Sequence, residues 1–327
     1  MKHYLKGRNK PEAYEILIVG TVPPSAGVGG VTIHVDRLLY WLAVKGQSVA
    51  LCDYKTQSII EVCRHIARHN VIHIHPSNPM FRLFLVVFAK LLGKGVIFTV
   101  HGDLGRFSSI KNYFDRLAVK WSDVPIVINE GSYWKALTWN ASARLMSAYL
   151  PPYAEGTVPE HVYDEIDKER NNGKIIVATN ASARSYTSDG REIYGIDFLV
   201  DYFSAQNDAC LFVSDPSSQY VESYNDREIK NVFFITEEHS FYALLKHSDI
   251  MVRATATDGD SLSIREALDL NIKVLATDCV ARPEGVCLFK YNDSTSLDNA
   301  MRAQYKPVAR MRQDIIGELI TLYNSFI

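Results

Sequence analysis

The sequence predicts an α/β protein made of two doubly wound domains, each a parallel sheet covered by helices on both faces. Three observations indicate this class. Short β-branched runs alternate with longer amphipathic segments, which is the pattern of strand–helix–strand units. The alternation stops once near the middle of the chain and then restarts. The length of 327 residues is enough for two domains of ordinary size.

The first round of alternation starts with a buried apolar strand and a helix. The strand is expected at Ile16–Gly20, and the helix, with apolar residues at helical spacing, at Val31–Lys45. Further strands are expected at Ser48–Cys52, Val71–His75, Gly95–Val100 and Val124–Asn129. Further helices are expected at Ser58–His69, Met80–Leu92 and Phe107–Trp121. This half therefore contains a complete parallel sheet.

The second round follows a polar interruption. The stretch Glu155–Gly173 is rich in charge and is interpreted as a linker. Strands are then expected at Lys174–Thr179, Ala209–Ser214, Asn231–Ile235, Asp249–Ala254 and Lys273–Thr277. We expect domains at residues 1–155 and 156–306, and a C-terminal amphipathic helix at 307–327 that packs back toward the first domain. Two such domains would face one another across a cleft at the carboxyl ends of their strands.

Charge and composition exclude several classes of protein. Residues 1–155 carry 18 basic and 10 acidic side chains, and the rest carry 17 and 27, so we expect an anionic partner near the first half. No basic stripe interleaved with aromatic residues indicates a nucleic-acid partner. Five widely spaced cysteines are typical of a reducing cytoplasm. The longest apolar stretch is seven residues, Leu83–Ala89, whereas a membrane span needs about 20.

Two sites in the first half are candidates for ligand binding. Gly29 and Gly30 lie in a loop before the first helix, where backbone N–H groups can bind an anion. Thr32 stands where a dinucleotide fingerprint needs a third glycine, although Asp53 lies roughly where a ribose-binding acid would, so an NAD site is disfavoured. His101 follows a strand and therefore points toward the expected cleft.

Two further histidines of this half lie on one strand. His73 and His75 alternate along it and so share a face of the sheet. No cysteine or clustered carboxylate accompanies them in the sequence. We interpret them as structural, and no metal is expected.

The strongest motif lies in the second half, after the strand that ends near Arg253. Small and acidic residues lead into a short helix with an acid upon it; they are Asp258, Gly259, Asp260, Ser261, Leu262, Ser263 and Glu266. We expect Ser261 or Ser263 to cap this helix, and Asn271 to end it in the left-handed conformation. A helix N-terminus between two carboxylates favours a sugar diphosphate.

The spacing Asp258-x7-Glu266 resembles the E-x7-E signature of the retaining glycosyltransferases of family 4, which have the GT-B fold. Supporting marks follow in order along the chain: Gly29-Gly30, His101 with Asp103, and Pro283–Val286. The resemblance implies two Rossmann-like domains, the first binding an acceptor and the second a nucleotide-diphosphate sugar. It also implies a role in assembling bacterial cell-surface polysaccharide or glycolipid, in the cytoplasm and at the inner face of the membrane.

The resemblance also assigns roles to residues. Glu266 would bind the ribose hydroxyls of a UDP- or GDP-sugar, and Asp258 the donor sugar. Backbone N–H groups of 261–263 would bind the diphosphate. Gly29 and Gly30 would close over it, and His101 would contact the transferred sugar. Neither a metal nor any further cofactor is implied.

The sequence departs from the family at two places. Asp258 is one methylene shorter than the usual glutamate. Tyr194 stands where the family has a lysine that neutralises the diphosphate, so we expect Arg184, Arg191 or Arg253 to supply the missing cation, with Arg184 favoured by its place near the strand end.

Other interpretations remain open at this point. Met80–Lys94 is either a core helix or an apolar face, flanked by Arg82, Lys90 and Lys94, that docks on an anionic membrane. Rival functions are a nucleotide-sugar epimerase of the same fold, an NAD-dependent oxidoreductase and a non-catalytic nucleotide-sugar binder. The sugar, the base and the acceptor are not determined by any short motif.

Overall fold

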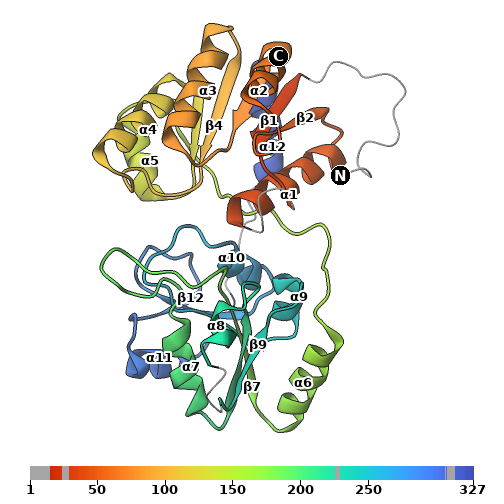
Figure 1. The fold of residues 1–327 in the computed structure, drawn as a ribbon, viewed down its shortest axis with the longest axis vertical. Coiled ribbons are helices and arrows are strands. Elements are labelled where there is room, and N and C mark those ends of the chain that lie inside the picture. The colour runs from red at the N-terminus through yellow and green to blue at the C-terminus, as the bar shows by residue number, and fades with distance from the viewer. Residues whose placement is uncertain (1–14, 24–28, 225–228, 306, 308–313) are drawn as a thin grey trace. The chain divides into compact units, whose positions relative to one another are not determined.

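A computed structural model describes the chain except for residues 1–14, 24–28, 225–228, 306 and 308–313. The chain divides into two compact units (Figure 1). The first comprises Met1–Tyr153 together with Arg312–Ile327, and the second Ala154–Met311. Each unit is built around its own parallel six-stranded sheet.

The first unit has the strand order β2-β1-β3-β4-β5-β6. Its strands are β1 Ile16–Gly20, β2 Val49–Asp53, β3 Val71–Ile74, β4 Gly95–Val100, β5 Val124–Val127 and β6 Arg144–Leu145. Its helices are α1 Gly30–Val44, α2 Ile59–Arg68, α3 Pro79–Leu91, α4 Ser109–Trp121, α5 Glu130–Leu137 and α12 Ile315–Asn324.

Apolar side chains point alternately to the two faces of this sheet, and each face has its own helices. Leu17 and Val19 of β1 pack in one core with residues of α2, α3, α4 and α5. Ile16 and Ile18 point the other way, into a core formed with α1 and α12. Burial on both faces explains why these strands are continuous apolar runs in the sequence.

The C-terminal helix α12 is anchored in the first unit by a buried polar contact. The Tyr323 hydroxyl lies 2.7 Å from Nδ1 of His73 on β3, and both residues are fully buried. Beside this contact, Phe326 packs against Gly95, where a Cβ atom would collide with the ring. The helix was expected over 307–327; it begins at Ile315, and residues 308–313 lie outside the described part of the chain.

The second unit has the strand order β12-β11-β10-β7-β8-β9. Its strands are β7 Ile175–Asn180, β8 Ala209–Ser214, β9 Val232–Ile235, β10 Ile250–Arg253, β11 Lys273–Thr277 and β12 Val286–Phe289. Its helices are α6 Glu160–Asn171, α7 Ile196–Ser204, α8 Gln219–Glu222, α9 Phe241–Lys246, α10 Leu262–Asp269 and α11 Ser294–Arg302. Helices α7, α8 and α11 pack on one face, and α6, α9 and α10 on the other.

The prediction of a linker over Glu155–Gly173 is wrong, because most of this stretch is helix α6. Charged residues dominate the helix, but Val162 and Ile166 lie four residues apart and are buried in the core of the second unit. Tyr163 packs against the same core, so one face of the helix is bound to the sheet. The expected strands and helices of the alternation are otherwise confirmed, to within a few residues at their ends.

Removing the Tyr323 hydroxyl tests how α12 is held. Tyr323→Phe leaves Nδ1 of His73 buried without its partner, so we expect the free energy of unfolding to fall by about 1–3 kcal/mol in urea denaturation. Tyr113→Phe is the matched control, since Tyr113 is 56% exposed and its loss should change stability by less than about 0.5 kcal/mol. Equal effects of the two substitutions would contradict this role for Tyr323.

Candidate functional site

The loop between β10 and α10 carries the strongest motif, and the structure shows how it leads into the helix. Ser261 is the residue before the first turn, but its hydroxyl lies 3.0 Å from the Ser263 hydroxyl and makes no capping bond to the backbone. The expectation of a serine cap is therefore corrected. Asn271 ends the helix with φ +58°, as predicted. Asp260 pairs with Arg265 on α10, their atoms 2.8 Å apart.

Asp258 is held between two guanidinium groups. Its Oδ2 accepts hydrogen bonds from Nε of Arg253 at 3.1 Å and from Nη1 of Arg282 at 2.7 Å. The Asp258 side chain is 9% exposed and that of Arg282 only 2%. Burial alone would raise the pKa of this carboxyl, but Arg253 and Arg282 lower it to about 2. Asp258 is thus ionised, and its oxygens already have partners.

Arg282 is the site residue that sequence reasoning missed. It lies in the loop after β11, and its Nε donates to the carbonyl of Thr277, the last residue of that strand, at 3.0 Å. A cation soon after a strand of a parallel sheet was the available signal, because such a position lies at the carboxyl edge where ligands bind. Neighbouring Pro283 was noted in the motif, whereas Arg282 was not.

Arg253 lies beside Tyr194, the tyrosine that stands where the family has a lysine. Its guanidinium carbon lies 5.4 Å from the centre of the Tyr194 ring. Its Nη1 also reaches Asn180, at the end of β7, with distances of 3.3 Å to both oxygens of that residue. The Tyr194 hydroxyl lies 2.6 Å from Ser182. Arg253 therefore spans the carboxyl ends of two neighbouring strands.

The other two arginines considered as replacements are differently placed. Arg184 forms a two-pronged ion pair with Asp197, at 2.7 and 2.8 Å, and stacks over Tyr220. Arg191 is half exposed and pairs with Asp189. Of the three arginines considered as replacements, only Arg253 joins the Asp258 cluster.

Glu266 lies on α10, eight residues after Asp258, and is 6% exposed. It shares the helix with Ile264 and Ala267, which pack in the core of the second unit. A carboxylate at this depth is positioned by the packing of α10.

Of the candidate residues of the first unit, Gly29 and Gly30 lie at the start of α1, and Asp53 is the last residue of β2. Gly29 precedes α1, where its N–H donates to the Thr32 hydroxyl at 2.9 Å and the hydroxyl donates back to the Gly29 carbonyl at 2.8 Å. Gly30 is the first residue of the helix, and residues 24–28 of the same loop lie outside the described chain. Asp53 accepts a hydrogen bond from the N–H of Lys55 and forms a local turn.

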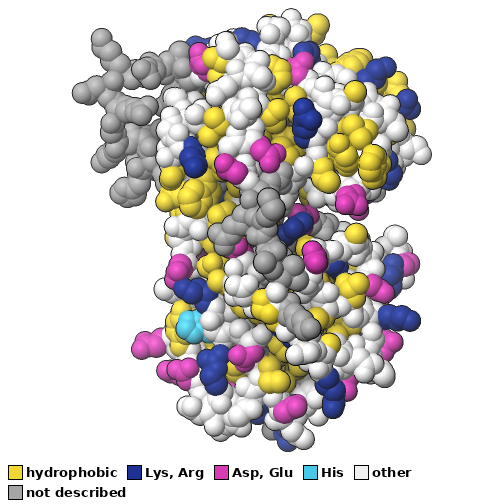
Figure 2. Space-filling view, turned by 180° about the vertical axis from the view of Figure 1, so that it is seen from behind, with side chains coloured by type: hydrophobic (Ala, Val, Ile, Leu, Met, Phe, Trp, Pro, Cys, Tyr) yellow, Lys and Arg dark blue, Asp and Glu magenta, His cyan; other side chains and the backbone are white. Residues whose placement is uncertain are grey.

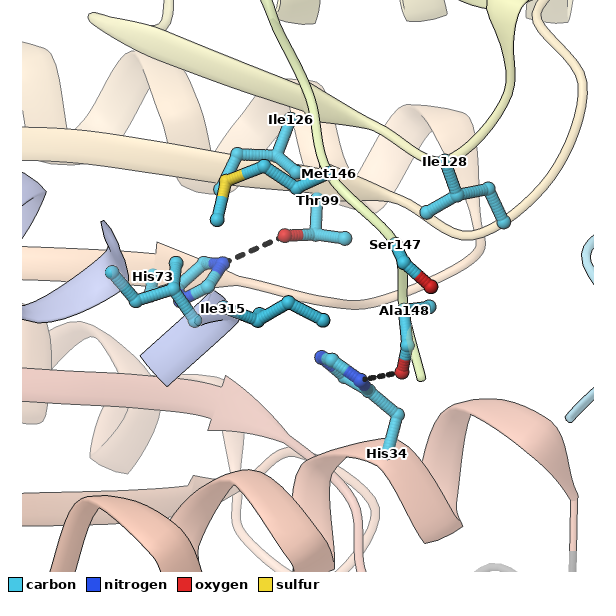
Figure 3. A pocket seen from close by; sticks show the side chains of 10 residues that line it. His34, His73, Thr99, Ile126, Ile128, Met146, Ser147, Ala148 and Ile315 are labelled. Atoms are coloured by element: carbon cyan, nitrogen blue, oxygen red, sulfur yellow. Dashed lines mark hydrogen bonds between the residues drawn. The ribbon is translucent and has the colours of Figure 1, made fainter. Parts of the chain in front are cut away.

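His101 lies in a cluster of four histidines. Its Nε2 is 2.9 Å from Nδ1 of His75, and its ring contacts that of His34. His73 completes the group, and its Nε2 lies 2.7 Å from the Thr99 hydroxyl (Figure 3). Burial lowers the pKa of His34 to about 4 and that of His73 to about 3, so these imidazoles are neutral at pH 7. Sequence reasoning noted three of these residues separately and missed His34.

Comparisons with known proteins show the fold. No known family model matches the chain, and no curated protein matches it in sequence. HepE from Anabaena in complex with UDP has a TM-score of 0.63 at 12% identity, covering 95% of this chain and 91% of its own. Trehalose-6-phosphate synthase OtsA gives 0.63 at 10% identity, with coverages of 95% and 94%. Sucrose-phosphate synthase from Thermosynechococcus elongatus gives 0.58 at 15%, with 88% of both chains. The chain therefore has the fold that these structures share, the GT-B fold.

The pKa of Asp258 gives a prediction for stability. Asp258→Asn leaves two buried guanidinium groups without a carboxylate, so we expect a loss of about 3–5 kcal/mol in the free energy of unfolding at pH 7. The folded pKa of about 2 lies below the ordinary value of 3.8, so the stabilisation is complete well above pH 4 and is lost as the pH falls toward 2. The difference between variant and parent should therefore narrow by roughly 1 kcal/mol between pH 5 and pH 3.

Asp189→Asn is the matched control, because it removes an exposed ion pair with Arg191. Because this side chain is exposed, the substitution should lower the free energy of unfolding far less than Asp258→Asn does. If the difference in free energy of unfolding between the parent and Asp258→Asn does not change between pH 5 and pH 3, the cluster is not ionised as described.

Proposed function

We propose that this chain is a glycosyltransferase that moves a sugar from a nucleotide-diphosphate sugar to an acceptor hydroxyl. The observation that carries the proposal is the pair of buried arginines, Arg253 and Arg282, beside the loop that leads into α10. Structural neighbours with the same fold support it, since HepE was solved with UDP and with UDP-glucose. A further neighbour, an E. coli protein structure described as trehalose-6-phosphate, has UDP-2-fluoro glucose bound.

The diphosphate is assigned to the start of α10. Residues 261–263 lie at the start of α10. The first backbone N–H groups of a helix have no acceptor within the helix, and the helix dipole adds positive potential there. Two guanidinium groups and one carboxylate leave the Asp258 cluster with a net charge of +1. Both features favour a ligand that carries two negative charges or more.

Asp258 is assigned a positioning role in place of a direct contact with the sugar. Its oxygens accept hydrogen bonds from both arginines, so it fixes their guanidinium planes at the ends of β10 and β11. Arg253, stacked beside Tyr194, then supplies the charge of the lysine that this chain lacks. Arg184 is a weaker candidate because Asp197 already neutralises it.

Glu266 is assigned to the ribose hydroxyls, as the resemblance implies. The acid lies on the helix whose first turn would hold the diphosphate, which matches the order ribose–diphosphate–sugar along the donor. The roles expected for Gly29, Gly30 and His101 stay predictions.

The chemistry proposed is transfer with retention. The bond between the sugar C1 and the diphosphate oxygen breaks, and the acceptor oxygen forms its bond to C1 on the same face. The acceptor proton passes to the departing phosphate oxygen. The protein then works through positioning and through charge stabilisation of the departing diphosphate by the two arginines. Assembly of a surface polysaccharide or glycolipid is proposed as the setting.

A non-catalytic nucleotide-sugar binder is the second candidate, favoured by the occupied carboxylate of Asp258. Incubation with UDP- and GDP-sugars and an acceptor panel separates the two. Release of free UDP or GDP that depends on an acceptor supports the transferase, whereas binding without release supports the binder.

Arginine variants test the assignment of the diphosphate. We expect Arg253→Ala and Arg282→Ala to lose more than tenfold in turnover, about 1.4 kcal/mol of transition-state stabilisation, because each removes a cation next to the leaving group. Arg191→Ala, which removes an exposed side chain, is the control and should change turnover less than twofold. Thermal unfolding of each variant checks that it is folded. If none of the variants Arg253→Ala, Arg282→Ala and Arg184→Ala loses tenfold in turnover, these arginines do not stabilise the leaving diphosphate.

We also propose that the first unit contacts an anionic membrane surface through α3 and α4. Met80, Leu83, Phe84 and Leu91 of α3 and Phe114 of α4 line an apolar groove of about 380 Å³, and Leu91 is 80% exposed. Hydrophobic side chains gather on the side of this unit where α3 and α4 lie, at the upper right of Figure 2. The opposite face of α3 packs in the core through Leu85, Val86 and Ala89, so the helix is apolar on both sides.

The flanking charges differ from those expected. Arg82 is fully buried in an ion pair with Asp115 and cannot face a lipid, which corrects its predicted role. Exposed cations are supplied by α4 instead, at Lys111, Arg116 and Lys120. None of the helices that the structure describes has the length and hydropathy of a membrane span.

Co-sedimentation with liposomes tests this contact. We expect binding to vesicles that contain anionic lipid, weakened severalfold by Leu91→Gln and by raised salt. Ile60→Gln, at an exposed position on α2, is the control and should leave binding unchanged. Binding that is absent, or insensitive to both salt and Leu91→Gln, would rule the contact out.

A further inference from the structure

Three histidines of the first unit converge, two of them buried and His101 partly buried. His34 lies on α1, His75 directly after β3, and His101 directly after β4. Each offers one ring nitrogen, and the three nitrogens lie within 4.8 Å of one another. The parallel pairing of β3 and β4 brings the last two together, because the strands end at the same edge of the sheet.

The protonation of His34 follows from its hydrogen bond. Its Nδ1 lies 2.7 Å from the carbonyl oxygen of Ala148, as Figure 3 shows. A carbonyl only accepts, so the proton is on Nδ1 and the lone pair is on Nε2. An imidazole whose second nitrogen donates to a carbonyl has the orientation usual for a metal-binding histidine.

His75 has a buried nitrogen that makes no hydrogen bond. Its Nδ1 faces Nε2 of His101 at 2.9 Å, while its Nε2 is buried without a hydrogen-bond partner. The residue is 1% exposed. Leaving a buried polar nitrogen unpaired is unfavourable, so this atom indicates that something outside the chain binds there.

The chemistry of the three side chains distinguishes the kind of ligand. A deprotonated imidazole nitrogen presents a lone pair to a metal ion, and metal binding itself favours that form of the ring. Neutral imidazoles are poor partners for an anion and good ligands for Zn²⁺, Cu²⁺ or Ni²⁺. His73 is not part of the set, because both of its nitrogens are engaged, with Tyr323 and with Thr99.

We propose that His34, His75 and His101 bind one divalent transition-metal ion of the zinc class. Three histidines leave a fourth position for water or a ligand oxygen, which is the pattern of an open zinc site. Zinc–nitrogen bonds of about 2.0–2.1 Å require the three nitrogens to lie nearer one another than 4.8 Å, so the proposal requires the rings to rotate on binding. The proposal does not rest on the proposed sugar transfer, and metal binding is an alternative to the sugar contact predicted for His101.

Zinc titration of the metal-free full chain tests the proposal. The thiols are first blocked with N-ethylmaleimide, because five free cysteines, including exposed Cys279, would otherwise compete for zinc. We expect one equivalent of Zn²⁺ to bind with at least micromolar affinity in calorimetry, and the unfolding temperature to rise. His75→Gln and His101→Gln should weaken binding tenfold or more. His161→Gln, on α6 and with a side chain 64% exposed, is the matched control and should bind like the parent.

Cobalt keeps the test decisive if the histidine variants fail to fold. Co²⁺ bound to the unsubstituted chain should give the intense visible bands of a four- or five-coordinate ion, and zinc should displace it. Absence of zinc binding, a weak six-coordinate cobalt spectrum, or equal affinity in His75→Gln and the parent would each overturn the proposal. Inorganic phosphate that binds in place of zinc, and is lost in the same variants, would overturn it in favour of an anion site.

Discussion

The ionised carboxylate of Asp258 is the interaction on which the candidate site of the second unit depends. It lies at the edge of the sheet where β10 and β11 end. Arg253, the last residue of β10, and Arg282, in the loop after β11, both donate hydrogen bonds to it. Desolvating three charges is costly, and only their mutual pairing offsets that cost. The cluster therefore fixes the directions of two guanidinium groups beside the first turn of α10. A binding site for a diphosphate needs just such a preformed set of donors, because a flexible set would lose entropy on binding.

The first unit is organised around histidines in a similar way. His73, on the central strand β3, contacts Tyr323 of α12. This contact holds α12 in the first unit, although α12 follows the whole second unit in the sequence. His75 and His101 follow neighbouring strands and meet His34 at the edge of the sheet. The Asp258 cluster and the pair His75–His101 both place polar groups at the carboxyl ends of parallel strands, the edge at which folds of this class bind ligands.

The sequence was sufficient for the fold because burial on both faces of a parallel sheet leaves a strong local pattern. It was insufficient for α6, where only Val162 and Ile166 distinguish a packed helix from a charged linker. It was also insufficient for contacts between distant residues. Arg282 joins Asp258 from 24 positions away, and the burial of Arg82 depends on its ion pair with Asp115. Such contacts are set by which strands are neighbours, and no local motif records that order.

The most direct test of the central claim is a crystal structure of the chain soaked with UDP and, separately, with GDP. We expect density for the diphosphate at the first turn of α10, within hydrogen-bond distance of Arg253 or Arg282, and for the ribose at Glu266. A nucleotide bound elsewhere, or arginines that stay on Asp258 with no phosphate near them, would contradict it. The better ordered of the two bases would also identify the donor nucleotide.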